Sequence, residues 1–349
     1  MGERTLTYAE AIREATSQEM ARDPAVRVFG ICIDDHRHFY GTLPPVEAFG
    51  PNRIRATPLS EDGITGAAIG AAMAGGKIIL CHERFEYVML TMNQLVNYAA
   101  KAHYMFGGAV AVPIVVRAVI GRSWGQGAQH SQALHSFFMH VPGFKVVAPT
   151  TPYDAKGCLA SAIRDLNPVL FVEHRLLHHK IRGYVPEEPY LVPFGCARLL
   201  AQGSDITIVG VSHMAVECLR AAQALDAVGI SAEVIDPVSL APLDMATLVA
   251  SARKTGRLLV VDNAWTSAGA SAEIALSVIE ALQGEREVRV KRMGFAPVPC
   301  PPSKPLEELF YPNPRTIAEA AYALVKGGEQ CWTPSAAISP EVMEFKGPF

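Results

Sequence analysis

Short hydrophobic runs alternate with helical patterns along the whole chain. The runs expected to be strands are, in a first series, Val26–Ile31, Lys77–Cys81, Val112–Ile120, Lys145–Pro149 and Pro168–His174, and in a second series Asp205–Ser212, Ala232–Val238, Arg257–Asn263 and Val288–Gly294. The segments expected to be helices are Tyr8–Arg22, Asp62–Ala74, Val88–Phe106, Pro152–Asp165, His213–Val228 and Ser267–Leu282. Strands that alternate with helices form parallel sheets covered on both faces. The pattern therefore predicts an α/β fold with two doubly wound domains.

One stretch between the two series lacks a clean period. His174–Pro193 has mixed charges and three prolines, and it is expected to be a surface linker. We therefore predict one domain over residues 1–190 and a second over 191–327. The tail, 328–349, has no periodicity and is expected to be extended.

Composition limits the class of protein. Hydrophobic residues make up 50% of the 349 residues and charged residues 19%, against about 25% charged in typical soluble domains. This balance predicts a large core or an obligate partner chain. The net charge of -3 argues against nucleic-acid binding. The sequence has no apolar run of membrane-spanning length and no N-terminus that resembles a signal peptide, so the chain is expected to be cytoplasmic. It has no C-x-x-C pair, so the cysteines are expected to be reduced and no zinc site is expected.

Three segments could carry chemistry. In the first, Glu61 and Asp62 follow Ser60 at the expected start of a helix, where a simple capping cluster is the alternative. The glycines that follow do not form the G-x-G-x-x-G of a dinucleotide site. In the second, a buried strand leads into a glycine-rich loop with His130, which could also be a solvated side chain. The third, Cys81–Tyr87, is rich in ionisable groups and could equally be a set of surface salt bridges.

Together these segments resemble one family. The motifs T-P-L-S-E-D-G-I-T-G, N-Q-L-V-N-Y-A-A-K, G-A-Q-H-S-Q, P-T-T-P-Y-D-A-K-G and A-I-R-D-L-N-P-V-L-F-V-E-H stand in the order and spacing of the beta subunits of thiamine-diphosphate-dependent 2-oxo acid dehydrogenases. V-I-D-P-V-S-L-A-P-L-D and K-T-G-R-L-L-V-V-D continue the resemblance, which covers roughly residues 5–325. It implies a pyrimidine-binding domain of the thiamin diphosphate-binding fold, followed by a domain of the transketolase C-terminal type.

The resemblance also assigns roles to single residues. Glu61 matches the carboxylate that hydrogen-bonds the aminopyrimidine ring and promotes proton loss from the thiazolium carbon. His130 matches a histidine near the reactive carbon that assists acyl transfer. Tyr87 matches an aromatic residue that packs on the pyrimidine, and Glu83 is a further expected cofactor contact.

A metal and a partner follow from the same resemblance. A structural potassium site in some members matches the carbonyls of Ile114, Ala162 and Ile163 with Asp165 and Asn167. The chain lacks the G-D-G…N-type motif that holds the Mg²⁺ of the diphosphate. An alpha-type subunit is therefore expected to hold that ion in an α2β2 heterotetramer, with the cofactor shared between the chains.

Departures from the family pattern leave the donor open. Ionisable side chains replace more apolar ones near the expected reaction centre, and His82, Arg84, Arg122 and Trp124 are expected to line a pocket for a polar, hydroxylated or phosphorylated donor. The leading function is decarboxylation of a 2-oxo acid with acyl transfer to a lipoylated acyltransferase. One alternative is a two-component transketolase-like enzyme that passes a two-carbon unit to a carrier such as an acyl carrier protein. The other is a non-catalytic assembly subunit.

Overall fold

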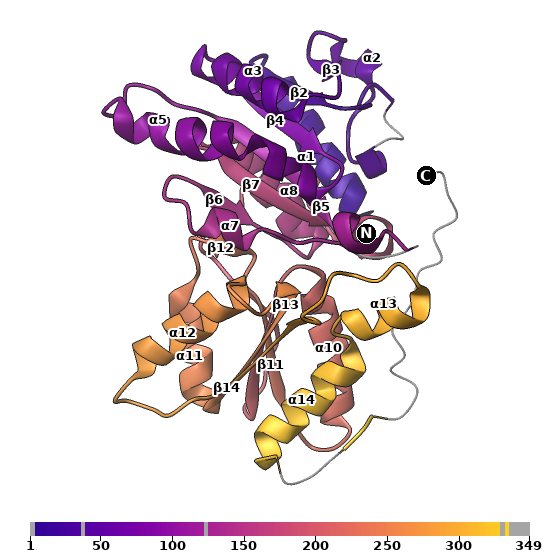
Figure 1. The fold of residues 1–349 in the computed structure, drawn as a ribbon, viewed down its shortest axis with the longest axis vertical. Helices are drawn as coiled ribbons and strands as arrows, with labels where there is room; N and C mark the ends of the chain where they lie inside the picture. Colours follow the sequence, from indigo (N-terminus) through magenta and orange to yellow (C-terminus); the bar gives the residue numbers. More distant parts are fainter. Residues whose placement is uncertain (1–3, 36–38, 122–124, 329–331, 335–349) are drawn as a thin grey trace. The chain divides into compact units, whose positions relative to one another are not determined.

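The computed structural model describes residues 4–35, 39–121, 125–328 and 332–334. The chain folds into two compact units (Figure 1). The first unit comprises Met1–Ile120, Ala133–Phe194 and Leu240–Pro242. The second comprises Gly121–Gln132, Gly195–Ser239 and Leu243–Phe349. The loop after the strand that ends at Ile120 thus belongs to the second unit.

A parallel sheet forms the centre of the first unit. Its strands lie in the order β12-β6-β7-β5-β4-β2-β3, with bounds β2 Val26–Gly30, β3 Ile54–Ala56, β4 Lys77–His82, β5 Ile114–Ile120, β6 Lys145–Val147, β7 Val169–His174 and β12 Ser239–Ala241. The strands from β3 to β6 in this order pair in parallel. Their carboxyl ends therefore meet at one edge, where parallel α/β sheets place their binding sites.

Helices cover this sheet, and several start at signals visible in the sequence. The helices are α1 Tyr8–Arg22, α2 Val46–Phe49, α3 Glu61–Met73, α4 Phe85–Val88, α5 Ala100–Met105, α7 Ser136–Met139, α8 Pro152–Arg164 and α9 Arg175–Lys180. At α1 the Thr7 hydroxyl accepts the Glu10 amide while the Glu10 carboxylate accepts the Thr7 amide, a capping box. Helices α1 and α8 pack side by side (Figure 1), and every residue of β5 and β7 is buried.

Two sequence expectations need correction in this unit. The segment expected to be one helix, Val88–Phe106, is a series of turns of different pitch: 3-10 at Met89–Thr91, π at Asn93–Ala99, and then α5. The expected linker is partly regular, because it contains α9 and β8 (Arg182–Tyr184), which pairs antiparallel with β1 (Thr5–Thr7). A three-residue strand with two exposed residues is too short to show an alternating pattern.

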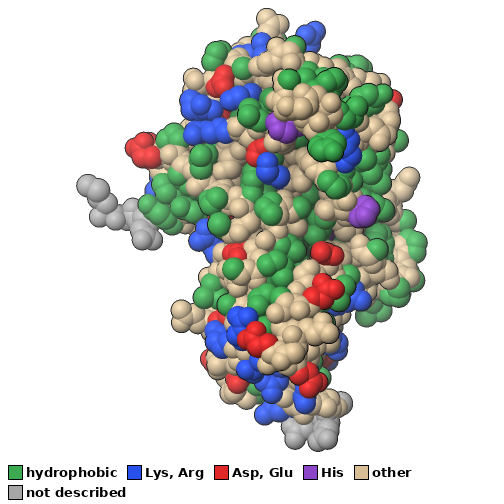
Figure 2. Space-filling view, turned by 90° about the vertical axis from the view of Figure 1, so that its left-hand side faces the viewer, with side chains coloured by type: hydrophobic (Ala, Val, Ile, Leu, Met, Phe, Trp, Pro, Cys, Tyr) green, Lys and Arg blue, Asp and Glu red, His purple; other side chains and the backbone are tan. Residues whose placement is uncertain are grey.

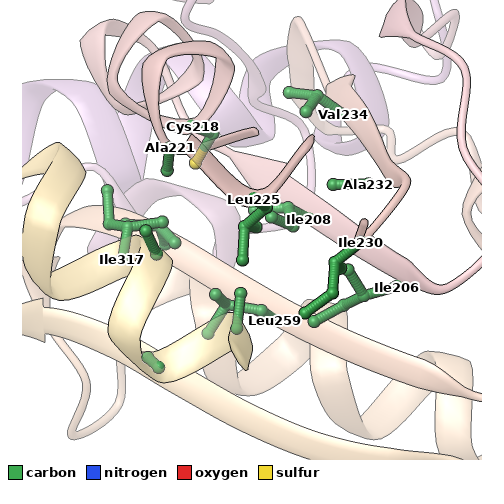
Figure 3. Close-up of a cluster of buried hydrophobic side chains, with 14 of the residues drawn as sticks. Ile206, Ile208, Cys218, Ala221, Leu225, Ile230, Ala232, Val234, Leu259 and Ile317 are labelled. Atoms are coloured by element: carbon green, nitrogen blue, oxygen red, sulfur yellow. The ribbon is translucent and has the colours of Figure 1, made fainter. Parts of the chain in front are cut away.

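The second unit has its own sheet, in the order β14-β13-β10-β11-β9. Its elements are β9 Arg198–Ala201, β10 Ile206–Gly210, β11 Ala232–Asp236, β13 Arg257–Trp265, β14 Arg289–Phe295, α6 Gly127–His130, α10 His213–Asp226, α11 Met245–Thr255, α12 Ala270–Leu282, α13 Lys304–Phe310 and α14 Pro314–Lys326. All pairs are parallel except β9 with β11. Leu225 of α10, Leu259 of β13 and Ile317 of α14 meet in its core (Figure 3). The predicted α/β class is confirmed.

The end of the chain lies mostly outside the described residues. Trp332 is described, and its ring stacks on Tyr322 of α14 at 5.0 Å between centroids. Among the described residues, we find no helix with the length and hydrophobicity that a membrane span requires.

Candidate functional site

Glu61 stands at the first position of α3, shortly after β3 ends at the carboxyl edge of the first sheet. Ser60 occupies the N-cap position, but its side chain makes no capping hydrogen bond. The sequence therefore located the helix start correctly, but the capping hydrogen bond expected of the Ser60 hydroxyl is not formed. Glu61 is half-buried, and the helix dipole favours a negative charge at this end.

Tyr87 comes from a different element and faces the same place. It belongs to α4, which follows β4 after two residues. Burial raises the pKa of the Tyr87 phenol, and the carboxylates of Glu86, Glu83 and Glu61 raise it further. Glu61 and Tyr87 thus follow two strands, β3 and β4, that both run parallel to β2 and end at the same edge of the sheet.

His82 is the last residue of β4 and is only 5% exposed. Its Nε2 atom has no hydrogen-bond partner among the described residues. Burial lowers the pKa of His82 to about 4, so the imidazole is neutral near pH 7. A buried, unpartnered ring nitrogen costs stability, and it is available to a ligand that can form a hydrogen bond.

Arg84 is held by hydrogen bonds to neighbouring residues. Its Nη1 donates to the Tyr40 hydroxyl at 2.5 Å and to the Glu83 carbonyl at 3.1 Å. Arg175 Nη2 donates to the same hydroxyl at 3.2 Å. Tyr40 has a φ of 60°, which is uncommon for a residue with a side chain, and its ring stacks on His178 at 4.9 Å. Arg84 makes no ion pair with any residue that the structure describes, so its charge can serve an anionic or polar ligand.

A buried ionic network lies beneath these residues. Arg117 of β5 donates to both carboxylate oxygens of Glu173 of β7, at 2.6 and 2.9 Å, and to Thr42 at 2.6 Å. His178 Nε2 lies 3.0 Å from the same carboxylate. Burial alone would raise the pKa of Glu173, but Arg117 and His178 together hold it at about 2. The sequence analysis missed this network, although an arginine inside V-P-I-V-V-R-A-V-I was a signal that a buried partner must exist.

His130, a further candidate site residue, belongs to the second unit. His130 ends the short helix α6 of the second unit and is half-buried. Arg122 and Trp124 lie outside the described residues. Sequence reasoning did not single out Cys300 and Tyr311, whose Sγ atom and hydroxyl lie 3.4 Å apart in the second unit.

The candidate potassium ligands gather at the end of α8. The Asp165 amide donates to the Ala162 carbonyl at 3.3 Å, and the Asn167 amide donates to Asp165 Oδ1 at 2.9 Å. The Lys145 ammonium binds both Asp165 oxygens, at 2.8 and 2.7 Å. This ammonium neutralises the Asp165 carboxylate, so the potassium site, with the carbonyls of Ile114, Ala162 and Ile163 and with Asp165 and Asn167, stays a prediction. Within the described ranges, no cluster of His, Cys, Asp or Glu suits a metal ion.

Family models match both units. Residues 4–180 match the pyrimidine-binding domain of transketolase, and residues 195–317 match the transketolase C-terminal domain. The chain is 40% identical to the acetoin:2,6-dichlorophenolindophenol oxidoreductase subunit beta of Cupriavidus necator, over 93% of this chain and 99% of that protein. It is 39% identical to a mitochondrial pyruvate dehydrogenase E1 component subunit beta-1 of Arabidopsis thaliana, over 92% and 89%.

The chain belongs to the beta subunits of the thiamine-diphosphate-dependent 2-oxo acid dehydrogenases. The predicted family is thereby confirmed, and with it the order of a pyrimidine-binding and a transketolase C-terminal-type domain. A solved structure titled split gene transketolase, inactive beta4 tetramer, has a TM-score of 0.72 and 22% identity, and covers 92% of this chain and 98% of its own. At that identity, the likeness supports the fold alone.

The residues of the first unit fit the cofactor of this beta-subunit family. A carboxylate can hydrogen-bond a pyrimidine nitrogen, and an aromatic ring can pack on the heterocycle. Glu61 and Tyr87 offer these two groups from neighbouring elements, both half-buried.

Proposed function

We propose that this chain is the beta subunit of an enzyme that decarboxylates a 2-oxo acid and passes the acyl unit to a lipoyl group. The observation that supports the proposal is that Glu61, at the start of α3 after β3, and Tyr87, on α4 after β4, follow the carboxyl ends of strands of one parallel sheet. Thiamine diphosphate, when bound, supplies the carbon nucleophile. The Glu61 carboxyl group hydrogen-bonds the pyrimidine ring, and Tyr87 fixes the plane of that ring. His130 assists proton transfer while the acyl unit passes to the acceptor thiol.

An alpha-type partner completes this site in the proposal, holding the Mg²⁺ of the diphosphate in an α2β2 heterotetramer in the cytoplasm. Large apolar side chains at and around α5 support a partner, since Tyr98, Tyr104, Met105 and Phe106 are more than half exposed and Tyr104 is 90% exposed. Figure 2 views this side of the first unit and shows hydrophobic side chains among the charged ones. Exposed apolar groups that cluster in this way are typical of interfaces.

The carboxylate of Glu61 is tested in the complex with the co-purified partner. Glu61→Gln should lower turnover by at least 10²-fold, the scale of general acid–base assistance, while the complex still assembles. Asp62→Asn is the matched control, because it removes one charge from the same helix turn at an exposed position. Turnover of Glu61→Gln within a few fold of the parent would refute the assignment.

A second candidate is cleavage of a ketol donor. The Cupriavidus necator relative is named for acetoin, a hydroxy ketone, and the polar groups of His82 and Arg84 suit a hydroxylated or phosphorylated donor better than a branched aliphatic one. A panel of pyruvate, branched-chain oxo acids, acetoin and xylulose 5-phosphate separates the two. We expect the branched-chain acids to have the lowest kcat/KM. If they turn over best, the polar pocket is wrong.

A further inference from the structure

Two guanidinium groups of the first unit converge on one hydroxyl oxygen. Arg84 Nη1 donates to the Tyr40 hydroxyl at 2.5 Å, and Arg175 Nη2 donates to it at 3.2 Å. The same hydroxyl donates to the Glu83 carbonyl at 3.4 Å. Because a phenol can donate and accept hydrogen bonds at once, this one neutral oxygen holds two positive charges next to each other.

Arg84 keeps one side of its guanidinium available to a ligand. Its Nη1 atom makes both of its hydrogen bonds, to Tyr40 and to the Glu83 carbonyl. The Nε and Nη2 atoms bond no residue that the structure describes, and they are not buried. These two N–H groups leave the planar guanidinium in parallel, which is the geometry that binds a carboxylate or a phosphate through two hydrogen bonds. An anion bound there also offsets the repulsion between the two guanidiniums.

The backbone that carries Tyr40 is strained. Phe39 and Tyr40 have φ values of 49° and 60°, and Gly41 follows at 68°, so three successive residues are left-handed. Residues with side chains are uncommon in this region, and such strain persists only where the surroundings enforce it. Here Arg117 of β5 donates to the Thr42 hydroxyl at 2.6 Å, and its guanidinium lies 4.7 Å from the centroid of the Phe39 ring. The buried ionic network therefore holds the turn that presents the Tyr40 hydroxyl.

Both arginines lie at the edge of the sheet where a cofactor contact is proposed. Arg84 is the N-cap of α4, and its carbonyl accepts the Tyr87 amide at 3.3 Å. Arg175 is the first residue of α9, directly after β7. Strands β4 and β7 each run parallel to β5, so both guanidiniums follow carboxyl ends of strands, where such sheets bind their ligands.

We propose that Arg84 and Arg175, held at Tyr40, bind a second anionic group of the donor, a carboxylate or a phosphate remote from the reacting carbonyl. The inference rests on the proposed function and narrows its substrate class. Arg84 contacts the anion directly, whereas Arg175, only 5% exposed, adds positive charge from below. Tyr40 is a positioning residue, since it fixes both guanidiniums. A donor that ends in an alkyl group gains no ion pair at this site.

Matched donors test the proposal in the assembled complex. 2-Oxoglutarate and 2-oxopentanoate have the same chain length, and only the first ends in a carboxylate, while xylulose 5-phosphate and xylulose differ by the phosphate. In at least one pair the anionic donor should have the higher kcat/KM, by about 10-fold or more, the value of a hydrogen bond to a charged group. Arg84→Met should lower that ratio about 10- to 150-fold, mainly through KM. The neutral donors should keep their kcat and KM.

Three further variants show whether the effect belongs to this site. Arg27→Met is the control and should leave the ratio unchanged, because Arg27 is also half-buried but lies near the amino end of β2. Tyr40→Phe removes only the hydroxyl, so it should raise KM for the anionic donor several-fold and leave kcat for the neutral donor unchanged. Arg84→Lys keeps the charge without the planar fork, so it should recover part of the ratio that Arg84→Met loses. Equal kcat/KM within both donor pairs, or a ratio that Arg84→Met does not lower, overturns the inference.

Binding of inorganic phosphate separates this inference from the proposed function. Calorimetric titration of the complex, loaded beforehand with thiamine diphosphate and Mg²⁺, measures phosphate affinity without turnover. Wild type and Arg27→Met should bind phosphate at least about 10-fold more tightly than Arg84→Met. If pyruvate is the only donor that turns over, the proposed function stands and the second anionic group is wrong. If neither pyruvate nor any donor of the two pairs turns over, the proposed function is wrong, and the titration alone decides the anion site: equal phosphate affinity of wild type and Arg84→Met overturns it.

Discussion

Replacing His82 by leucine should stabilise the chain while it damages the enzyme. The two side chains are similar in size, and the wild-type imidazole is 5% exposed with an Nε2 atom that has no partner among the described residues. An unsatisfied buried polar atom costs about 1–3 kcal/mol. At pH 8, where the imidazole is neutral in the folded and the unfolded chain, His82→Leu should recover a free energy of unfolding of that order.

The gain should grow as the pH falls. Burial lowers the pKa of His82 from 6.5 to about 4. Between these two values the unfolded chain binds a proton at this residue that the folded chain excludes. Wild-type stability therefore decreases with falling pH, by about 1.4 kcal/mol per pH unit. At pH 5, about 1.5 units below 6.5, the loss should be about 2 kcal/mol, and His82→Leu should not show it.

Thermal unfolding of wild type and variant, compared at pH 8 and pH 5, measures this difference. At about 2–4 °C per kcal/mol for a unit of this size, the gap in Tm should be about 4–8 °C wider at pH 5. Other histidines of low pKa, such as His178, are common to both proteins and cancel. His140→Leu, at an exposed position, is the control and should show no such widening.

The second part of the prediction is the loss of enzyme activity in His82→Leu. If the imidazole serves a polar donor, kcat/KM of His82→Leu should fall about 5- to 150-fold, which corresponds to about 1–3 kcal/mol. A gap in Tm that is the same at both pH values would refute the buried neutral imidazole. Unchanged kcat/KM in a stabilised variant would refute its role at the site.

Two further predictions concern the supporting structure. Arg117→Met should destabilise the first unit by about 3–5 kcal/mol, because it leaves the Glu173 carboxylate buried without its main partner. The control is Arg253→Met, which breaks an exposed ion pair and should leave Tm unaltered. A Tm of Arg117→Met equal to that of the parent would contradict this. Leu225→Ala should lower the free energy of unfolding by about 2–5 kcal/mol, because it opens a cavity in the core of Figure 3. Urea unfolding measures this loss, and Leu276→Ala, at a half-exposed position, is the control. Equal urea midpoints for the two variants would count against that core.

The central strands could be predicted because burial on both faces requires continuous apolar runs. The ends of β4 and β7 differ from the expected ends by no more than one residue. Helices α11 and α14 were not predicted, although Asp244 and Asn313 are N-caps whose side chains bond the first turn. Short elements such as β8 were missed because their existence depends on a partner strand distant in sequence.

The same distinction between local and long-range signals holds for the candidate site. Roles for Glu61 and Tyr87 could be predicted from motifs and stay predictions, and the structure places both residues near a helix start or strand end that the sequence marks. The pairing of Arg117 with Glu173 depends on the register of β5 against β7, in which Arg117 lies opposite Phe171 and Glu173 opposite Val119. No local pattern contains that register.

The buried polar groups at the carboxyl edge of the first sheet are of two kinds. Arg117, Glu173 and His178 bond one another, although Arg117 Nη1 and His178 Nδ1 have no partner among the described residues. His82 and Arg84 lie outside this network: His82 Nε2 has no partner among the described residues, and the Arg84 guanidinium, which donates to Tyr40 and to the Glu83 carbonyl, has no counter-charge among them. Such groups lower stability, and a ligand that bonds them recovers the loss. A donor with a hydroxyl or anionic group can do so, whereas an aliphatic donor would leave the imidazole without a hydrogen-bond partner and the guanidinium without a counter-charge. The selectivity of this subunit should therefore arise more from rejection of apolar donors than from tight binding of polar ones.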